Sequence, residues 1–228
     1  MDYTVKDIAK MIDHSLLNPK MTDVELEDGC KIALDYDVAS VCIKPYYVKR
    51  AAGILKGSGV KVGTTIGFPH GGHTTAIKVQ ETRLAFIDGA EEFDMVVNIG
   101  KVLSLDWHYV FDDIKAVVEE GHAKGKIVKV IFENCFLQDE HKIRLCEICG
   151  QVSADFVKTS TGYGDGGATI DDLKLMRKHS PPNVQVKAAG GIRTFDQTLE
   201  VRAVGVTRIG ATKTIEILEE CKKRLGNL

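Results

Sequence analysis

Residues 155–164 read DFVKTSTGYG and residues 184–191 read VQVKAAGG, and each stretch is a short apolar run that ends on a lysine before a glycine turn. Runs of this length and composition are typical of strands. Between them, the apolar residues of Ile170–Lys178 recur at helical spacing. A strand, a helix and another strand in this order predict two parallel strands joined by a helical crossover. Lys158 and Lys187 would then end neighbouring strands of one sheet.

The same unit repeats along the whole chain. Short apolar runs predict eight strands, at Met11–Ser15, Ser40–Ile43, Lys61–Ile66, Glu92–Asn98, Ile127–Glu133, Phe156–Thr159, Val184–Lys187 and Thr207–Ile209. Helical spacing predicts eight helices, at Val24–Leu34, Val48–Leu55, Thr74–Ile87, Trp107–Ala123, Asp139–Gln151, Ile170–Lys178, Phe195–Ala203 and Thr214–Leu225. Eight alternating units of about 28 residues favour a closed α/β barrel of the (β/α)8 or TIM type, as a single domain over residues 1–228. A doubly wound open sheet is the structural alternative.

The composition is that of an ordinary globular protein. The 228 residues are 44% hydrophobic and 27% charged, with a formal net charge of -2. This balance predicts no broad positive field for a nucleic acid or an anionic membrane. No apolar run approaches the roughly 20 residues of a membrane span. Residues 1–11 carry four charged side chains where a secretory signal needs an apolar segment, so we expect a cytoplasmic protein.

Neither the cysteines nor the histidines predict a metal site. The six cysteines lack the spacing of a disulfide framework, which suits a reducing compartment. The CxxC pair Cys146 and Cys149 lies in a helical stretch, where a buried structural pair is favoured over a redox or metal role. His70 and His73 have no further ligands nearby, and the chain has no GxGxxG or Walker sequence. We therefore expect no metal and no nucleotide cofactor.

The two lysines at the strand ends suggest a particular chemistry. A free lysine has a pKa of about 10.4 and is not nucleophilic at neutral pH, but burial or a neighbouring cation lowers that value. The neutral amine can attack a carbonyl to give an iminium ion, which stabilises an adjacent carbanion and permits carbon–carbon bond cleavage. Lys158 and Lys187 on adjacent strands therefore suggest an aldolase that needs no metal.

Other polar residues fall at predicted strand ends, where a barrel gathers its active-site groups. Asp94 lies among apolar residues and would act either as the ion-pair partner of a lysine or as the acid/base of a proton relay. The sequence leaves these two roles open. The glycine turns Gly190–Gly191 and Gly210–Thr212 follow the last two strands, where many barrels bind a phosphate through backbone amides.

At these residues the chain resembles the deoxyribose-phosphate aldolase family. Members of this family are class I aldolases that interconvert 2-deoxy-D-ribose 5-phosphate with D-glyceraldehyde 3-phosphate and acetaldehyde. The resemblance covers nearly the whole chain and consists of several motifs in a fixed order. These motifs are Ile12–Leu17, Ser40–Pro45, Gly67–Gly71, Glu92–Gly100, Lys129–Glu133, Lys158–Thr169, Lys187–Thr194 and Arg208–Thr212.

The resemblance implies a role for each matching position. Lys158 would be the Schiff-base lysine, Lys187 the neighbour that lowers its pKa, and Asp94 the carboxylate of the proton relay. The substrate pocket would be lined by four further residues, Asp13, Cys42, Lys129 and Thr161. Cys42 would face the acetaldehyde-derived group, and Lys129 with Asp13 would support a network of water and hydroxyl groups. The phosphate would be held, mostly by backbone amides, at Gly162, Gly190, Gly191, Gly210 and Thr212.

The resemblance also implies an enzyme without a cofactor, acting on a sugar phosphate and an aldehyde as a homodimer or higher homo-oligomer. Four positions depart from the family pattern, namely Lys44, His70, Ala189 and Lys213. The last of these would either strengthen phosphate binding or point into solvent. Two other functions stay open at this point. One is a Schiff-base aldolase for another sugar phosphate, and the other is a barrel that binds a sugar phosphate without catalysis.

Overall fold

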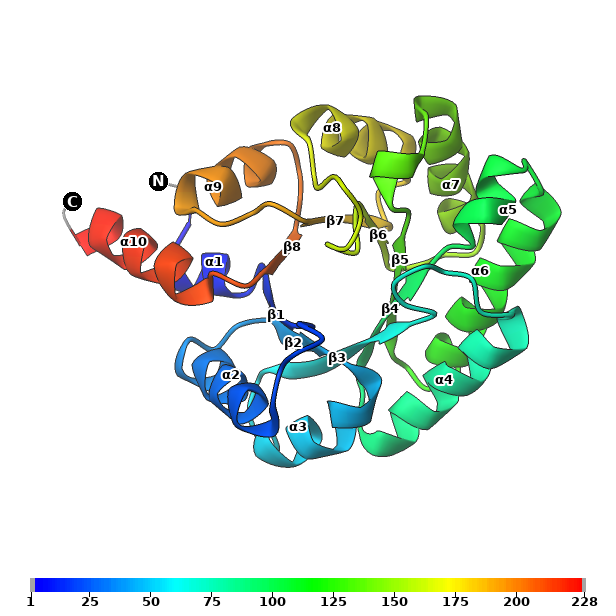
Figure 1. Cartoon of the computed structure of the whole chain (residues 1–228). Coiled ribbons are helices and arrows are strands. Elements are labelled where there is room, and N and C mark those ends of the chain that lie inside the picture. Colours follow the sequence, from blue (N-terminus) through cyan, green and yellow to red (C-terminus); the bar gives the residue numbers. More distant parts are fainter. Residues whose placement is uncertain (1–2, 227–228) are drawn as a thin grey trace.

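The strand and helix patterns close into a barrel in the computed structural model, which describes residues 3–226. Within this range, eight strands pair in parallel in chain order, and β8 pairs with β1 to complete the ring. The helices surround the strands, as Figure 1 shows. The predicted (β/α)8 barrel is confirmed, and the alternative of an open doubly wound sheet is wrong.

All sixteen predicted elements are present, with ends that differ by up to two residues. The strands are β1 (Ile12–Leu16), β2 (Ser40–Ile43), β3 (Lys61–Ile66), β4 (Glu92–Val96), β5 (Ile127–Ile131), β6 (Phe156–Lys158), β7 (Gln185–Ala189) and β8 (Arg208–Ala211). The helices are α1 (Val5–Ala9), α2 (Asp23–Asp35), α3 (Val48–Ile54), α4 (Thr75–Asp88), α5 (Ile99–Leu103), α6 (Trp107–His122), α7 (Asp139–Gln151), α8 (Ile170–His179), α9 (Phe195–Ala203) and α10 (Thr214–Gly226).

Helices α1 and α5 have no counterpart among the predicted elements. Each has five residues, too few for an apolar period to be recognised. Capping groups start both helices: Thr4 and Asp7 form a capping box on α1, and the Asn98 side chain accepts a hydrogen bond from the backbone amide of Lys101 on α5. Because Asn98 caps a helix, the predicted strand Glu92–Asn98 is two residues too long.

Side chains along each strand alternate between the helix layer and the barrel interior. On β4, Phe93 is fully buried beside Gly121 of α6, where a β-carbon would come within 3.5 Å of its ring. Glu92 and Asp94 on the same strand turn inward and accept hydrogen bonds from Lys129 of β5. Barrel interiors are usually filled by branched apolar residues. Here the apolar core lies between strands and helices, and charged side chains occupy the interior.

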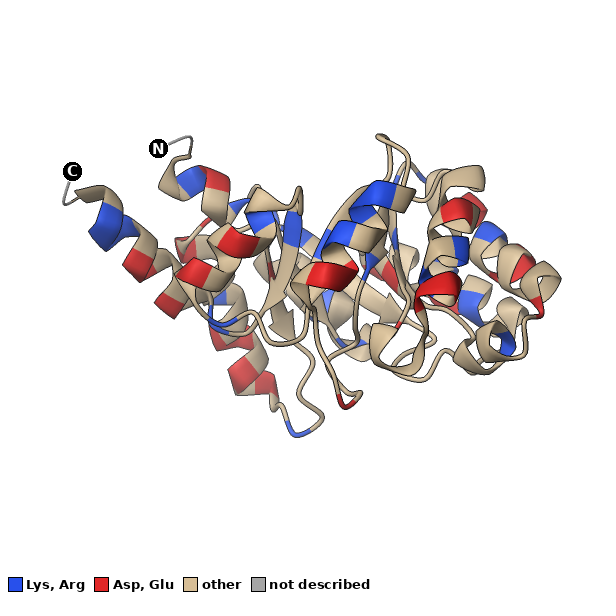
Figure 2. Cartoon of the chain, turned by 90° about the horizontal axis from the view of Figure 1, so that it is seen from above, with Lys and Arg blue, Asp and Glu red and all other residues tan. Residues whose placement is uncertain are grey.

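The outer helices carry charges of both signs. Figure 2 shows acidic and basic residues interspersed along these helices, in keeping with the formal net charge of -2. In the described part of the chain, no helix combines the length and the apolar character that spanning a membrane requires.

The CxxC pair lies inside the protein. Cys146 and Cys149 of α7 are fully buried and not disulfide-bonded. Burial raises the pKa of the Cys146 thiol to about 11 and that of the Cys149 thiol well above its ordinary value. Both thiols are therefore protonated and packed at neutral pH, as the favoured interpretation of this pair predicts.

A buried ion pair fixes two helices against the strand that carries Asp94. Lys78 of α4 and Asp113 of α6 are fully buried, and the Lys78 Nζ lies 2.5 Å from the Asp113 Oδ2. The same Nζ donates a hydrogen bond of 2.9 Å to the carbonyl oxygen of Val96, the last residue of β4. Removing one partner of such a pair leaves an uncompensated charge out of water.

We therefore expect Asp113→Ala to lower the free energy of unfolding by about 3–5 kcal/mol, because the Lys78 ammonium loses its counter-charge. Urea denaturation followed by circular dichroism measures this loss. The neighbouring Asp112 is exposed, so Asp112→Ala is a matched control that should change the stability by less than about 0.5 kcal/mol. Equal losses in the two variants would contradict the role given to the pair.

Candidate active site

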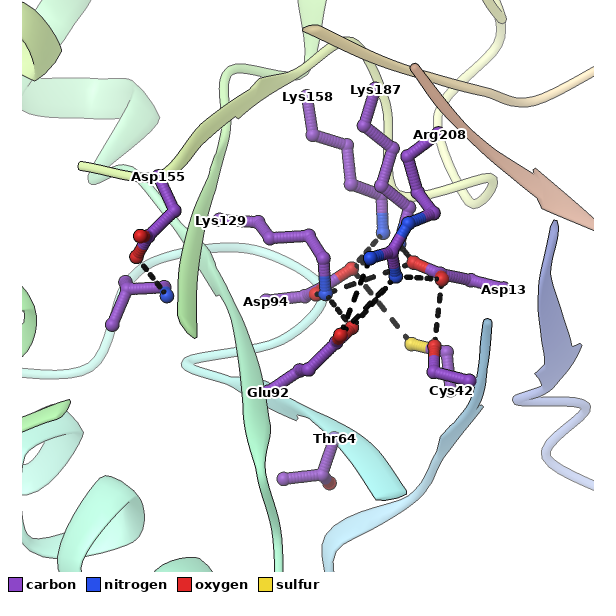
Figure 3. Close-up of polar contacts among 12 residues, drawn as sticks. Asp13, Cys42, Thr64, Glu92, Asp94, Lys129, Asp155, Lys158, Lys187 and Arg208 are labelled. Atoms are coloured by element: carbon purple, nitrogen blue, oxygen red, sulfur yellow. Dashed lines mark hydrogen bonds and ion pairs between the residues drawn. The ribbon is translucent and has the colours of Figure 1, made fainter. Parts of the chain in front are cut away.

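Charged side chains from β1, β4, β5, β6, β7 and β8 meet inside the barrel. Figure 3 shows these side chains pointing toward one another. Alternation along β4 brings two of them inward, and each of the other strands supplies one. Among the described residues, three are carboxylates and four are bases: Asp13, Glu92, Asp94, Lys129, Lys158, Lys187 and Arg208. All but Arg208 are fully buried. Such a cluster is tolerated only where the charges pair with one another.

Asp94 is the common partner of the three lysines. Its Oδ1 accepts a hydrogen bond of 2.8 Å from Lys129, and its Oδ2 accepts hydrogen bonds of 2.8 Å from Lys158 and 2.7 Å from Lys187. Burial alone raises the pKa of the Asp94 carboxyl, but the three ammonium groups outweigh burial and hold that pKa well below its ordinary value. Asp94 is therefore a carboxylate at neutral pH, shared among three bases.

Lys158 and Lys187 differ in the number of carboxylates that they contact. The Lys187 Nζ donates to both Asp13 and Asp94, whereas the Lys158 Nζ donates to Asp94 alone among the described residues. Burial, aided by the nearby Lys187 ammonium, lowers the pKa of Lys158 despite the pull of Asp94. Burial opposes the charged form of Lys187 too, but Asp13 and Asp94 prevail and raise its pKa. Of this pair, Lys158 is the amine that loses its proton first.

The remaining predicted pocket residues lie in the same cluster. Lys129 donates to Glu92 at 2.6 Å, and Asp13 accepts a hydrogen bond of 2.7 Å from the Ser40 hydroxyl. The Cys42 thiol lies 3.9 Å from the Asp94 Oδ2. Burial, with a contribution from the Asp94 charge, raises the pKa of Cys42 to about 11, so it stays a neutral thiol. The Cys42 side chain is therefore a small uncharged group beside the lysines.

A cavity of about 770 Å³ opens from Lys158 toward the loops at the carboxyl ends of the strands. Thr161 and all five predicted phosphate-binding residues line it, namely Gly162, Gly190, Gly191, Gly210 and Thr212. Gly190 has a φ of 81°, and a β-carbon there would come within 2.8 Å of the Gly167 Cα. The chain therefore needs glycine at this position for both conformation and space. Helix α10 begins at Thr214, so its amino terminus lies next to this end of the cavity.

Thr161 is held by a buried carboxylate. Its hydroxyl donates to Glu133, its backbone amide donates to the Glu133 Oε1 at 3.1 Å, and its Oγ1 accepts a hydrogen bond of 3.0 Å from the Tyr163 amide. Glu133 is itself in the left-handed conformation, with a φ of 60°. The Thr161 hydroxyl proton is thus used to shape the loop after β6.

Known proteins share this arrangement of sequence and fold. A family model described as DeoC/LacD family aldolase matches residues 8–215. The chain belongs to this aldolase family. It is 62% identical over 225 residues to the deoxyribose-phosphate aldolase of Rhodopirellula baltica, and the alignment covers 99% of this chain and 93% of that protein.

Solved structures resemble this aldolase in fold. A structure from Coccidioides immitis superposes with a TM-score of 0.92 at 37% identity, covering 96% of this chain and 87% of that chain. The deoxyribose phosphate aldolase of Aeropyrum pernix, described as tetrameric, superposes with a TM-score of 0.89 at 29% identity, covering 97% and 93% of the two chains. The aldolase class expected from the sequence is confirmed.

None of the four residues that depart from the family pattern forms a contact with the charged cluster in the described part of the chain. Lys213 is exposed and forms an ion pair of 2.6 Å with Glu216, and it does not line the cavity of this aldolase. Lys44 donates to the Asn18 carbonyl oxygen, and His70 is exposed. Ala189 is buried and lines the cavity. In the structure the Lys213 side chain faces solvent.

Sequence reasoning missed several residues of the site. Glu92 and Arg208 belong to the charged cluster, and Tyr163 and Arg193 line the cavity. A signal existed for Glu92, since it lies two residues before Asp94 and strand alternation puts both side chains on one face. Tyr163 carried no comparable signal, because its hydroxyl donates to the carbonyl oxygen of Leu17, a loop residue 146 positions away.

We expect Lys187→Leu to slow the aldolase and to move the rise of its pH–rate profile to higher pH by about one to two units. The reason is the sign of the coupling: the Lys187 ammonium lowers the pKa of Lys158, so without it the neutral amine forms only at higher pH. The profile of kcat/KM reports this free-enzyme pKa. A slow variant with an unshifted profile would contradict the role.

Proposed function

We propose that this aldolase reversibly cleaves 2-deoxy-D-ribose 5-phosphate to D-glyceraldehyde 3-phosphate and acetaldehyde, through a Schiff base on Lys158. The observation that carries the proposal is the position of the Lys158 Nζ. It is buried, has a lowered pKa, and lines a cavity that the glycine turns also line. The 62% identity to a deoxyribose-phosphate aldolase supports the choice of substrate.

The first step requires a neutral amine beside a proton donor. The Lys158 amine adds to the C1 aldehyde of the open-chain sugar, and the resulting hydroxyl leaves as water to give an iminium ion. Lys187 stays an ammonium because Asp13 and Asp94 raise its pKa, and it contacts the same Asp94 oxygen as Lys158. Lys187 can therefore donate the proton that makes this hydroxyl a leaving group.

The second step breaks the bond between C2 and C3. Loss of the C3 hydroxyl proton releases D-glyceraldehyde 3-phosphate, and the electron pair of the broken bond moves into the iminium to form an enamine. The enamine is then protonated at C2, and hydrolysis frees acetaldehyde and the Lys158 amine. We assign the proton transfers to Asp94 with a water that Lys129 and Asp13 help to hold, since Asp94 contacts the Lys158 Nζ and Lys129 lies within ion-pair distance of both Asp94 and Asp13. Cys42 bounds the space of the two-carbon unit.

The phosphate belongs at the outer end of the cavity in this proposal. Backbone amides of the glycine turns and the amino terminus of α10 favour an anion there. Thr161 contributes by shaping the loop that carries Gly162. Arg193 adds a cationic side chain to the cavity wall.

The proposal extends to the state of the enzyme. We propose a single-domain enzyme that needs no metal or nucleotide cofactor, works in the cytoplasm and forms a homo-oligomer. The tetrameric relative from Aeropyrum pernix supports self-association. So does helix α4, on which Ile77, Leu84 and Ile87 are at least half exposed and recur at helical spacing.

Borohydride trapping tests the substrate, the mechanism and the residue together. Reduction in the presence of 2-deoxyribose 5-phosphate should add the reduced adduct to the peptide that contains Lys158. Lys158→Ala should give no adduct and only background turnover, with the fold intact by circular dichroism, because the nucleophile is removed without adding a buried charge. A folded wild-type protein without an adduct would favour the non-catalytic sugar-phosphate-binding barrel. An adduct with dihydroxyacetone phosphate rather than acetaldehyde as donor would favour another aldolase.

The glycine turn offers a matched pair of variants for the phosphate site. Gly190→Ala places its β-carbon against Gly167, whereas no atom lies within 4 Å of a β-carbon at Gly191. Both glycines have positive φ, so the pair separates crowding from backbone strain. We expect KM for the phosphorylated substrate to rise about tenfold more in Gly190→Ala than in Gly191→Ala, or about 1.4 kcal/mol. Similar KM values for the two variants would contradict a role of the Gly190 turn in phosphate binding.

A further inference from the structure

Three bases stand side by side on one wall of the barrel. The strand register aligns Lys158 of β6 with Lys187 of β7, and Lys187 with Arg208 of β8. Like charges on neighbouring strands repel one another. The carboxylates that compensate them come from β1 and β4, at Asp13, Glu92 and Asp94.

The charges in this cluster do not cancel when every group is ionised. Among the described residues, four bases face three carboxylates, which leaves one positive charge in excess. A buried cluster can remove such an excess by releasing a proton. Arg208 cannot release one at accessible pH, because a guanidinium remains protonated. The proton must therefore come from a lysine.

The contacts determine which lysine it is. Lys129 and Lys187 each contact two carboxylates within hydrogen-bonding distance, whereas Lys158 contacts only Asp94 in the part of the chain that is described. Arg208 donates to Asp13 at 2.5 Å and to Glu92 at 3.0 Å, and it makes no contact with Lys158 among these residues. Arg208 therefore shares the carboxylates Asp13 and Glu92 with Lys187 and Lys129, and it reduces the negative charge that compensates the lysines.

We propose that Arg208 and Glu92 are positioning residues that set the protonation state of Lys158, with Arg208 supplying the surplus positive charge that favours the neutral amine. Within the described part of the chain, neither residue contacts Lys158. Arg208 pairs with Asp13 and Glu92 pairs with Lys129, so both act on Lys158 through these neighbours. The inference rests on the proposed Schiff-base function for its biological meaning. The effect of Arg208 and Glu92 on the protonation of Lys158 is argued from the contacts within the cluster and does not depend on that function.

The other ionisable groups around Lys158 are accounted for. Cys42 of β2 is a neutral thiol, because burial raises its pKa to about 11. His14 of β1 faces Thr214, and burial lowers its pKa to about 4, so it is uncharged near neutral pH. Glu133, after β5, is bound by the Thr161 hydroxyl and amide and contacts none of the four bases among the described residues. On β3, the inward Thr65 carries no charge.

The numbers of bases and carboxylates in the cluster predict that replacing Arg208 and replacing Glu92 shift the pKa of Lys158 in opposite directions. Arg208→Met leaves three bases for three carboxylates, so Lys158 keeps its proton to higher pH. Glu92→Gln leaves four bases for two carboxylates, so Lys158 loses its proton at lower pH. The double variant has three bases and two carboxylates, which restores a surplus of one.

The first measurement does not depend on turnover. Cyanate carbamylates neutral amines, and peptide mass mapping follows its rate at Lys158 from about pH 6 to about pH 10. We expect the midpoint for Arg208→Met to lie about one pH unit above the wild-type midpoint, and that for Glu92→Gln to lie below it. The double variant should return toward the wild type. Arg144→Met, which removes a partly exposed arginine that is not part of the cluster, controls for net charge and should leave the midpoint unchanged.

A folded Arg208→Met protein with the wild-type midpoint would overturn the proposal, and so would a double variant shifted as far as either single variant. If Arg208→Met does not fold, Glu92→Gln decides, and an unshifted midpoint there overturns the proposal. The pH–rate profile for deoxyribose 5-phosphate cleavage should move with the carbamylation midpoint. A wild-type protein with the expected carbamylation pattern but no cleavage would refute the proposed function and leave the electrostatic inference intact.

Discussion

The Asp94 carboxylate accepts hydrogen bonds from the amino groups of three lysines, and the barrel interior is built around this shared contact. Taking ions out of water costs several kcal/mol each, so a lone lysine at any of these positions would be strongly unfavourable. The shared carboxylates offset this cost. Because Lys129 and Lys187 each contact two carboxylates and Lys158 contacts one, the three lysines differ in how strongly their charged forms are stabilised. The least compensated amine is the one that faces the cavity, which is the position where a nucleophile is useful.

The barrel supplies what this cluster requires. Closure brings residues as distant in sequence as Asp13 and Arg208 into contact, and no short segment could place six strands around one point. The apolar faces of the strands pack outward against the helices, so the fold does not depend on an apolar interior for its stability. Buried pairs such as Lys78 with Asp113 hold the helices against the strands that carry the charged groups. The outward-facing side chains of the strands therefore stabilise the fold, and the inward-facing ones form the charged cluster.

Much of this arrangement follows from local patterns in the sequence. Alternating strands and helices predict the barrel, and lysines before glycine turns predict the reacting group. The long-range contacts are less accessible, because Glu92 and Arg208 become partners only after the ring closes. Likewise, the use of the Thr161 hydroxyl by Glu133 depends on the turn after β5. The short helix after Asn98 was hidden because a capping side chain, and not an apolar period, starts it.

Strand alternation also has a consequence for how such a protein can change through evolution. Each charged side chain points inward because of its odd or even position along a strand, so inserting or deleting one residue within a strand would turn that side chain toward the helices. In a closed ring the neighbours on both sides fix the register, and β6 has only three residues in which to absorb an error. Changes of length are therefore confined to the loops, while the strands can vary in composition but not in length.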